Sequence, residues 1–195
     1  MAKKPPYKNR KYVSHSGEMH RNGATYAINA KKSGIYSAIL HKMIDQLDIC
    51  MNKWKRVLLI RFDLHIPFYT ADNKVISRFR KNLIRRLERE YQINEIGYVW
   101  VREQEKAKHQ HYHCAIYLNG NAIRHSSKTL RIIKDTWERI NIENYMHAPK
   151  NPYYFIDNEQ TKQEAIYRIS YLAKARGKGY RDKQAKDYST SRLFI

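Results

Sequence analysis

The stretch from residue 97 to residue 118 constrains the fold most, because polar and apolar side chains alternate along its second half. Successive side chains of an extended strand point to opposite faces of a sheet. Three imidazoles would therefore lie on one face of this strand, and apolar side chains would lie on the other. The imidazole set is His109, His111 and His113, and the apolar set is Tyr112, Cys114, Ile116 and Leu118. The pattern predicts a half-buried strand with one imidazole face.

A second strand just upstream would bring a carboxylate close to these histidines. Residues 98–102 are rich in aromatic and β-branched side chains, as strands are. The polar segment 104–108 would turn the chain, so that the two strands pair antiparallel with Glu103 near the histidines. Two imidazoles and one carboxylate, with coordination positions left for water and substrate, suit Mg²⁺ or Mn²⁺.

We therefore predict a divalent-metal site on this hairpin. A single histidine on a half-buried strand is usually a solvated surface residue, but three on one face beside a carboxylate favour metal binding. The predicted ligands are His111, His113 and Glu103, with Glu105 as the alternative third ligand and His109 as an outer neighbour.

The strand predicted at residues 57–65 has the same alternation. Its apolar face would join the core, and its other face carries Arg61, Asp63 and His65. This polar face would either be solvated or take part in a site.

A helix predicted at residues 160–176 carries the second group of reactive side chains. Thr161 and Glu164 have the spacing of a capping box. At about 100° per residue, Tyr167, Tyr171 and Lys174 fall in a narrow band opposite the apolar stripe. Packing of the core does not require these tyrosines, which form either an ordinary amphipathic surface or part of a site.

The charge balance indicates a polyanionic partner. The chain has 38 Lys and Arg against 18 Asp and Glu, a net charge of +20, and 16 tyrosines spread among them. Positive charge combined with stacking side chains is typical of nucleic-acid-binding proteins. The two cysteines lack the spacing of a zinc finger or a disulfide framework, and no Walker motif for ATP binding occurs. We expect no membrane-spanning helix and no signal peptide.

The chain is predicted to divide into a basic N-terminal arm with a helical extension, residues 1–54, and a main domain, residues 55–195. The arm proper would cover residues 1–24, and an amphipathic helix over residues 33–54 would pack on the core. Further helices are predicted at 74–91 and 126–140. The basic tail after Gly177, with Lys178 and Arg181, is a candidate clamp on single-stranded DNA.

These motifs resemble those of a known superfamily. His111-Tyr112-His113 with Glu103 resembles motif 2 of the HUH endonucleases, which include rolling-circle replication initiators, relaxases and related transposases. Tyr171-Leu172-Ala173-Lys174 matches the Tyr-x-x-Lys of motif 3, and Tyr167 with Tyr171 is similar to the paired tyrosines of phage A-type initiators. With the strand at 61–65, residues 55–195 look most like inovirus-type replication proteins and their YagK/YfjJ-type prophage relatives.

The resemblance implies an α+β fold, with an antiparallel RRM-like or ferredoxin-like sheet of roughly five strands and helices mainly on one face. It implies a site-specific single-stranded DNA endonuclease and strand transferase that initiates rolling-circle replication of a phage, plasmid or satellite element. Tyr171 would form a 5′-phosphotyrosine, assisted by Lys174, and Tyr167 would be a second nucleophile or a base-stacking residue. The residues expected to contact DNA are Arg61, Asp63, His65, His109, Lys178 and Arg181.

The implied partners are single-stranded DNA at a replication origin and the helicase and polymerase of a prokaryotic host, in whose cytoplasm the protein would act. Within the superfamily, a transposase or relaxase is the alternative. A non-catalytic nucleic-acid-binding module and a metal-dependent nuclease that uses water are alternatives of other classes. The water-using nuclease would not require Tyr171.

Overall fold

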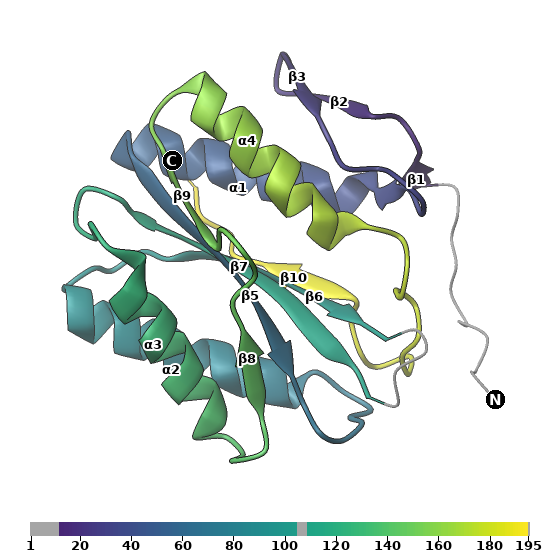
Figure 1. The fold of residues 1–195 in the computed structure, drawn as a ribbon, viewed down its shortest axis with the longest axis vertical. Coiled ribbons are helices and arrows are strands. Elements are labelled where there is room, and N and C mark those ends of the chain that lie inside the picture. Colours follow the sequence, from purple (N-terminus) through teal and green to yellow (C-terminus); the bar gives the residue numbers. More distant parts are fainter. Residues whose placement is uncertain (1–11, 105–108, 195) are drawn as a thin grey trace.

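A six-stranded antiparallel sheet forms the centre of the protein in this computed structural model, which describes residues 12–104 and 109–194 (Figure 1). The strand order is β10-β6-β7-β5-β8, and β9 also pairs with β5. The bounds are β5 Val57–His65, β6 Gly97–Glu103, β7 His111–Asn119, β8 Tyr145–His147, β9 Tyr153–Ile156 and β10 Tyr188–Thr190. The predicted α+β class is confirmed, with six strands where roughly five were expected.

Helices cover both faces of this sheet (Figure 1). On one face, α1 (Ser37–Trp54) and α4 (Glu159–Ser170) pack on a core that includes Leu59 and Val101. On the other face, α2 (Lys74–Tyr91) and α3 (Ser126–Glu138) pack on a core that includes Phe62 and Cys114. The expectation of helices mainly on one face is therefore corrected.

The reason for two covered faces lies in the central strands. Val57 and Leu59 of β5, and Ala115 and Tyr117 of β7, are apolar on the face that also carries the histidines. Both faces of the sheet are therefore apolar over most of their length and need cover, because exposed apolar surface is unfavourable in water. On the α1 and α4 face the end of β5, the start of β7 and Glu103 at the end of β6 are polar, and the candidate site lies there.

The described part of the N-terminal region forms strands, whereas a basic arm without strands was expected at residues 1–24. A hairpin of β2 (Glu18–Arg21) and β3 (Ala24–Ala27) turns at Asn22 and Gly23, whose φ angles are +49° and +77°. Asn-Gly with positive φ at both positions is the preferred two-residue hairpin turn, a signal present in the sequence. Two short strands, β1 (Val13–Ser14) and β4 (Ile35–Tyr36), pair beside it. Residues 1–11 of the predicted arm lie outside the described residues.

The helix predicted at 160–176 begins and ends earlier than expected. Its capping box is formed by Asn158 and Thr161 rather than by Thr161 and Glu164. After Ser170 the chain continues as a 3₁₀ turn, η2 (Tyr171–Ala173). Tyr171 therefore lies at the C-terminal end of α4, as the first residue of η2. Among the described helices, none combines the length and the apolar character that crossing a bilayer requires.

Candidate active site

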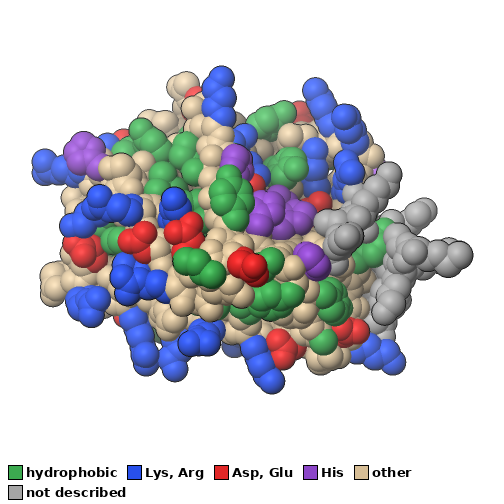
Figure 2. All heavy atoms as spheres, turned by 60° about the horizontal axis from the view of Figure 1, so that its bottom comes forward, with side chains coloured by type: hydrophobic (Ala, Val, Ile, Leu, Met, Phe, Trp, Pro, Cys, Tyr) green, Lys and Arg blue, Asp and Glu red, His purple; other side chains and the backbone are tan. Residues whose placement is uncertain are grey.

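Strand pairing aligns residues from four strands in two rows across the sheet, and all of them except Val101 are polar. The first row is Glu103, His111, His65 and Tyr145, on β6, β7, β5 and β8. The second row is Val101, His113, Asp63 and His147 on the same four strands. Figure 2 shows histidine side chains gathered on one face of the molecule. The sequence placed Glu103 near the histidines, and the antiparallel register between Glu103 and His111 bears that out.

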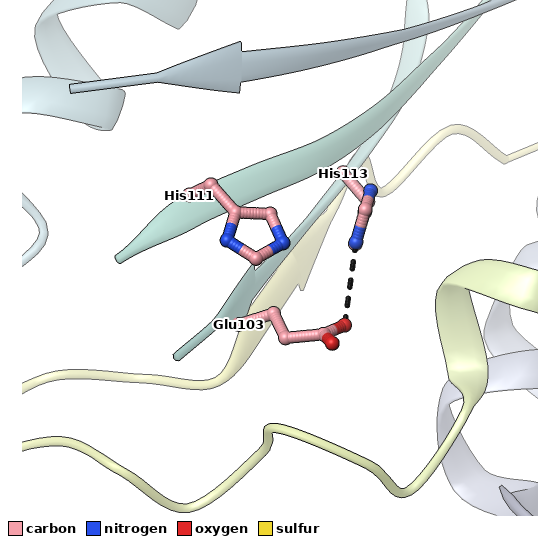
Figure 3. Close-up of side chains that lie close together, drawn as sticks. All are labelled: Glu103, His111 and His113. Atoms are coloured by element: carbon pink, nitrogen blue, oxygen red, sulfur yellow. Dashed lines mark ion pairs between the residues drawn. The ribbon is translucent and has the colours of Figure 1, made fainter. Parts of the chain in front are cut away.

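The three predicted metal ligands lie together at one end of these rows (Figure 3). One ligand atom from each of Glu103, His111 and His113 lies within 4.8 Å of the other two. Nε2 of His113 is 3.3 Å from Oε2 of Glu103. The alternative ligand Glu105 lies outside the described residues. Two imidazoles and one carboxylate at this spacing fit a divalent cation that keeps positions for water and substrate.

The pKa values of the two histidines are shifted in opposite directions. Burial, together with the charge of the neighbouring His113, lowers the pKa of His111 to about 4. His111 is therefore neutral near pH 7, the form that binds a metal. Burial also lowers the pKa of His113, but hydrogen bonds to Asp63 and Glu103 outweigh burial, and the pKa is raised overall.

Asp63 orients His113 from behind. Nδ1 of His113 is hydrogen-bonded to Oδ1 of Asp63 at 2.7 Å, so that Nε2 is turned toward Glu103. Oδ2 of Asp63 lies 3.6 Å from Nη2 of Arg61. Asp63 and Arg61 are only 8% and 5% exposed. Both are expected to contact DNA, and in this structure both are buried beside His113 and Tyr171.

Tyr171 packs directly against this cluster. Its ring is 5.5 Å from the ring of His113 and nearly perpendicular to it. The guanidinium carbon of Arg61 lies 4.7 Å from the centroid of the Tyr171 ring, and Nζ of Lys174 lies 5.2 Å from it. The Tyr171 side chain keeps 38% of its surface exposed. A tyrosine distant in sequence is thus positioned beside one predicted metal ligand, His113, with two cations next to its ring.

A model of the YagK/YfjJ C-terminal domain matches residues 19–188, a range that includes every residue described in this site. The chain belongs to the YagK/YfjJ C-terminal domain family. It is 26% identical to the uncharacterized protein YagK of Escherichia coli (strain K12), over 73% of this chain and 86% of that protein. It is 28% identical to the uncharacterized protein YfjJ of the same organism, over 68% of this chain and 83% of that protein. No solved structure gives a significant match.

The second tyrosine of this YagK/YfjJ domain has different surroundings. Tyr167 is 44% exposed and lines a shallow depression with Ala27, Tyr154, Gln163 and Glu164. Lys174 follows η2, and its ammonium donates to the backbone oxygen of Lys31 at 3.4 Å. Tyr171 is the tyrosine that contacts a predicted ligand, so the two tyrosines are not equivalent in this fold.

Two basic residues that were expected in an exposed tail are held within the domain. Lys178 is 1% exposed, and its ammonium lies 3.7 Å from Oε2 of Glu103. Burial lowers the pKa of Lys178 to about 8, although Glu103 and Asp187 act in the opposite direction. Nε of Arg181 is 3.0 Å from Oδ1 of Asp187. The tail is ordered because β10 adds to the edge of the sheet beside β6.

Of the remaining predicted residues, His65 contacts a predicted ligand and His109 lies just outside β7. His65 is exposed at the end of β5, and its ring stacks on that of His111 at 5.5 Å with 14° between the planes. His109 precedes the first residue of β7, so it does not share the strand face that was expected for it. The sequence reading missed Tyr145 and His147, because β8 has three residues and is too short to show a period.

Proposed function

We propose that the protein is a metal-dependent tyrosine endonuclease and strand transferase of the HUH type that acts on single-stranded DNA. Its biological role would be the initiation of rolling-circle replication of a phage, plasmid or satellite element. One observation carries the proposal: the ring of Tyr171 lies 5.5 Å from that of His113, which itself clusters with Glu103 and His111. A nucleophile and a cation site next to each other are what phosphodiester transfer to a tyrosine requires.

A divalent cation held by Glu103, His111 and His113 would polarise the scissile phosphate as a Lewis acid. The surrounding residues prepare this ligand set before any ion binds. Asp63 holds the His113 ring, and burial keeps His111 neutral. Outer residues of this kind typically contribute 10- to 100-fold to metal affinity or activity.

Tyr171 would then attack the scissile phosphorus with its phenolic oxygen. The bond from Oη to phosphorus forms as the bond from phosphorus to the 3′-oxygen breaks. The phenol releases a proton and the departing 3′-oxygen takes one up, which leaves a 5′-phosphotyrosine and a free 3′-OH. The positive charges of Arg61 and Lys174, next to the Tyr171 ring, would stabilise the negative charge that develops during the attack.

Rejoining needs only the reverse reaction. A 3′-OH attacks the phosphotyrosine, the new phosphodiester forms, and Tyr171 is released with its proton restored. Because the covalent link conserves the energy of the original bond, no ATP is required, which is consistent with the lack of a Walker motif in the sequence.

The test incubates the full chain with Mn²⁺ and 5′- or 3′-labelled single-stranded DNA from the intergenic region of its own genetic element. Denaturing gels then separate free DNA from DNA that is covalently attached to protein. We expect an adduct with the unmodified protein, and no adduct with Tyr171→Phe or His111→Ala. Tyr153→Phe is the matched control, since Tyr153 is similarly exposed but lies on the opposite face of the sheet.

Tyr167→Phe, tested in parallel, separates one-tyrosine from two-tyrosine chemistry. An adduct that forms but cannot be transferred to a second strand would assign Tyr167 as a second nucleophile. Cleavage that produces no adduct and continues in Tyr171→Phe would contradict the proposal and indicate a nuclease that uses water. Binding without any cleavage would indicate a nucleic-acid-binding module.

A further inference from the structure

The two rows of polar residues continue past the metal ligands to the edge strand β8. In the first row, Tyr145 pairs with His65, which pairs with His111, which pairs with Glu103. Neighbouring strands are about 4.8 Å apart, so the row spans about 14 Å from Glu103 to Tyr145. A DNA strand with one phosphate at the metal ligands would therefore reach Tyr145 within a few nucleotides.

Tyr145 is the exposed end of a series of aromatic rings. It is 55% exposed, and its ring centroid is 5.7 Å from that of His65. His65 in turn stacks on His111, and the ring of His147 is 6.5 Å from that of Tyr145. These separations are those of interacting aromatic pairs. Tyr145 belongs to neither hydrophobic core of the described residues, so packing does not account for it.

The surroundings of this ring suit a nucleobase. Every base has a π-face that can stack on an exposed aromatic side chain. Within residues 12–104 and 109–194, the ring nitrogens of His65 and His147 make no hydrogen bond, and an imidazole can donate to or accept from a base edge. Figure 2 shows Lys and Arg side chains distributed around the histidines, and the chain as a whole carries a net charge of +20, which favours a phosphate backbone.

We propose that Tyr145, with His65 and His147, forms a stacking site for an unpaired base of single-stranded DNA a few nucleotides from the scissile phosphate. The inference rests on the proposed function for the identity of the strand and deepens it, because it sets the path of the DNA. The DNA strand crosses β8, β5 and β7 in that order, and its scissile phosphate lies next to Tyr171.

The test measures how much the bases contribute to binding. The full chain, kept in EDTA so that no cleavage occurs, is titrated against two fluorescein-labelled 15-nucleotide probes by fluorescence anisotropy. One probe is oligothymidylate, and the other has the same backbone with abasic sites throughout. Because both probes carry the same phosphates, the ratio of their dissociation constants reports contacts to bases.

We expect the unmodified protein to bind oligothymidylate more tightly than the abasic probe. Tyr145→Ala should weaken oligothymidylate binding by about fivefold or more, which is the effect of losing one stacked base, and should leave abasic binding unchanged. Tyr145→Phe should retain the preference, because the ring is kept. Tyr153→Ala, which removes an exposed ring from the opposite face, should also retain it.

The inference is overturned if Tyr145→Ala binds both probes as the unmodified protein does, or if Tyr153→Ala loses as much affinity. Its failure can be distinguished from failure of the proposed function. If an adduct forms that depends on Tyr171, and Tyr145→Ala has no effect on binding, the proposed nuclease is supported and the stacking site is rejected. If the preference for bases depends on Tyr145 but no adduct forms, the DNA-binding surface is supported and the enzymatic function is rejected.

Discussion

Asp63 is the residue that connects the predicted metal ligands to the candidate nucleophile. One carboxylate oxygen holds His113 at 2.7 Å, and the other lies 3.6 Å from Arg61, which packs over Tyr171. Burial raises the pKa of Asp63, but the hydrogen bond to His113 and the charges of His113 and Arg61 outweigh it, and the pKa is lowered overall. Asp63 therefore stays ionised near pH 7 and fixes the direction of the His113 ring.

Replacing Asp63 by Asn tests this role. The amide keeps the size of the side chain but loses the charge that stabilises the Nδ1–H form of His113. We expect the affinity for Mn²⁺, measured by isothermal titration calorimetry, to fall by about 10- to 100-fold. Asp135→Asn changes an exposed acidic residue of α3 and should leave the affinity unchanged. Equal affinity in Asp63→Asn and the unmodified protein would show that His113 does not depend on Asp63.

The position of the Glu103 side chain depends on Gly177. Its φ is +74°, and a Cβ atom at this position would overlap the side chain of Glu103, with 2.7 Å to Oε1. The backbone oxygen of Gly177 also accepts a hydrogen bond from the amide of Gln104 at 2.8 Å. The chain thus passes so close to the predicted ligand that only glycine fits there.

Two glycine substitutions distinguish the effect of backbone strain from the effect of displacing the Glu103 side chain. Gly177→Ala and Gly23→Ala both place alanine at a positive φ, and this backbone strain should cost each about 1 kcal/mol of unfolding free energy in urea, to which the overlap with Glu103 adds in Gly177→Ala. No atom lies within 4 Å of a Cβ at Gly23, so only Gly177→Ala should also weaken Mn²⁺ binding. Matching losses of Mn²⁺ affinity in both variants would contradict the role of Gly177.

Among the helices and strands, the sequence predicted those long enough to show a regular spacing of apolar residues. The helix expected at 74–91 agrees with α2, strands were expected at β5, β6 and β7, and the antiparallel pairing of β6 with β7 was predicted. The strands β8 and β10 have three residues each, which is too short for a period to be read, and they form because a neighbouring strand offers unpaired backbone groups. The site was therefore predicted at the histidine hairpin and at Tyr171, but not at Tyr145.

The N-terminal hairpin is anchored to α1 by one ion pair. Nε and Nη2 of Arg21 bond to the two carboxylate oxygens of Asp45 at 2.8 and 2.6 Å. Burial raises the pKa of Asp45, but the hydrogen bonds from Arg21 and Asn22 outweigh burial and lower it overall. The ion pair therefore stabilises the fold above the ordinary pKa of aspartate, and the contribution disappears as pH falls through the lowered value.

Asp45→Asn should accordingly cost about 0.5 to 1 kcal/mol of unfolding free energy at pH 7, the usual size for a partly exposed pair. The difference between Asp45→Asn and the unmodified protein should shrink as pH is lowered below about 4, in urea unfolding followed by circular dichroism. Glu18→Gln, on an exposed position of the same hairpin, serves as the control and should be neutral. A difference that stays constant with pH would exclude the ionic contribution.

At the scale of the whole molecule, the candidate site exists only in the folded domain. Arg61 and Asp63 come from β5, Glu103 from β6, the two histidine ligands from β7, and Tyr171 from the end of α4. The sequence indicates which of these residues are candidates for a site, because their side chains are reactive and regularly spaced. It could not indicate that Lys178 is buried against Glu103, since a basic tail with glycines has no pattern that predicts burial.

The central claim is that Tyr171 forms the covalent bond to DNA. The most direct measurement isolates the protein–DNA adduct formed with Mn²⁺, digests both components, and locates the linked nucleotide by tandem mass spectrometry. We predict a nucleotide joined through its 5′-phosphate to Tyr171 and to no other residue before strand transfer. A linkage exclusively at Tyr167, or cleaved DNA with an unmodified Tyr171 peptide, would contradict the account.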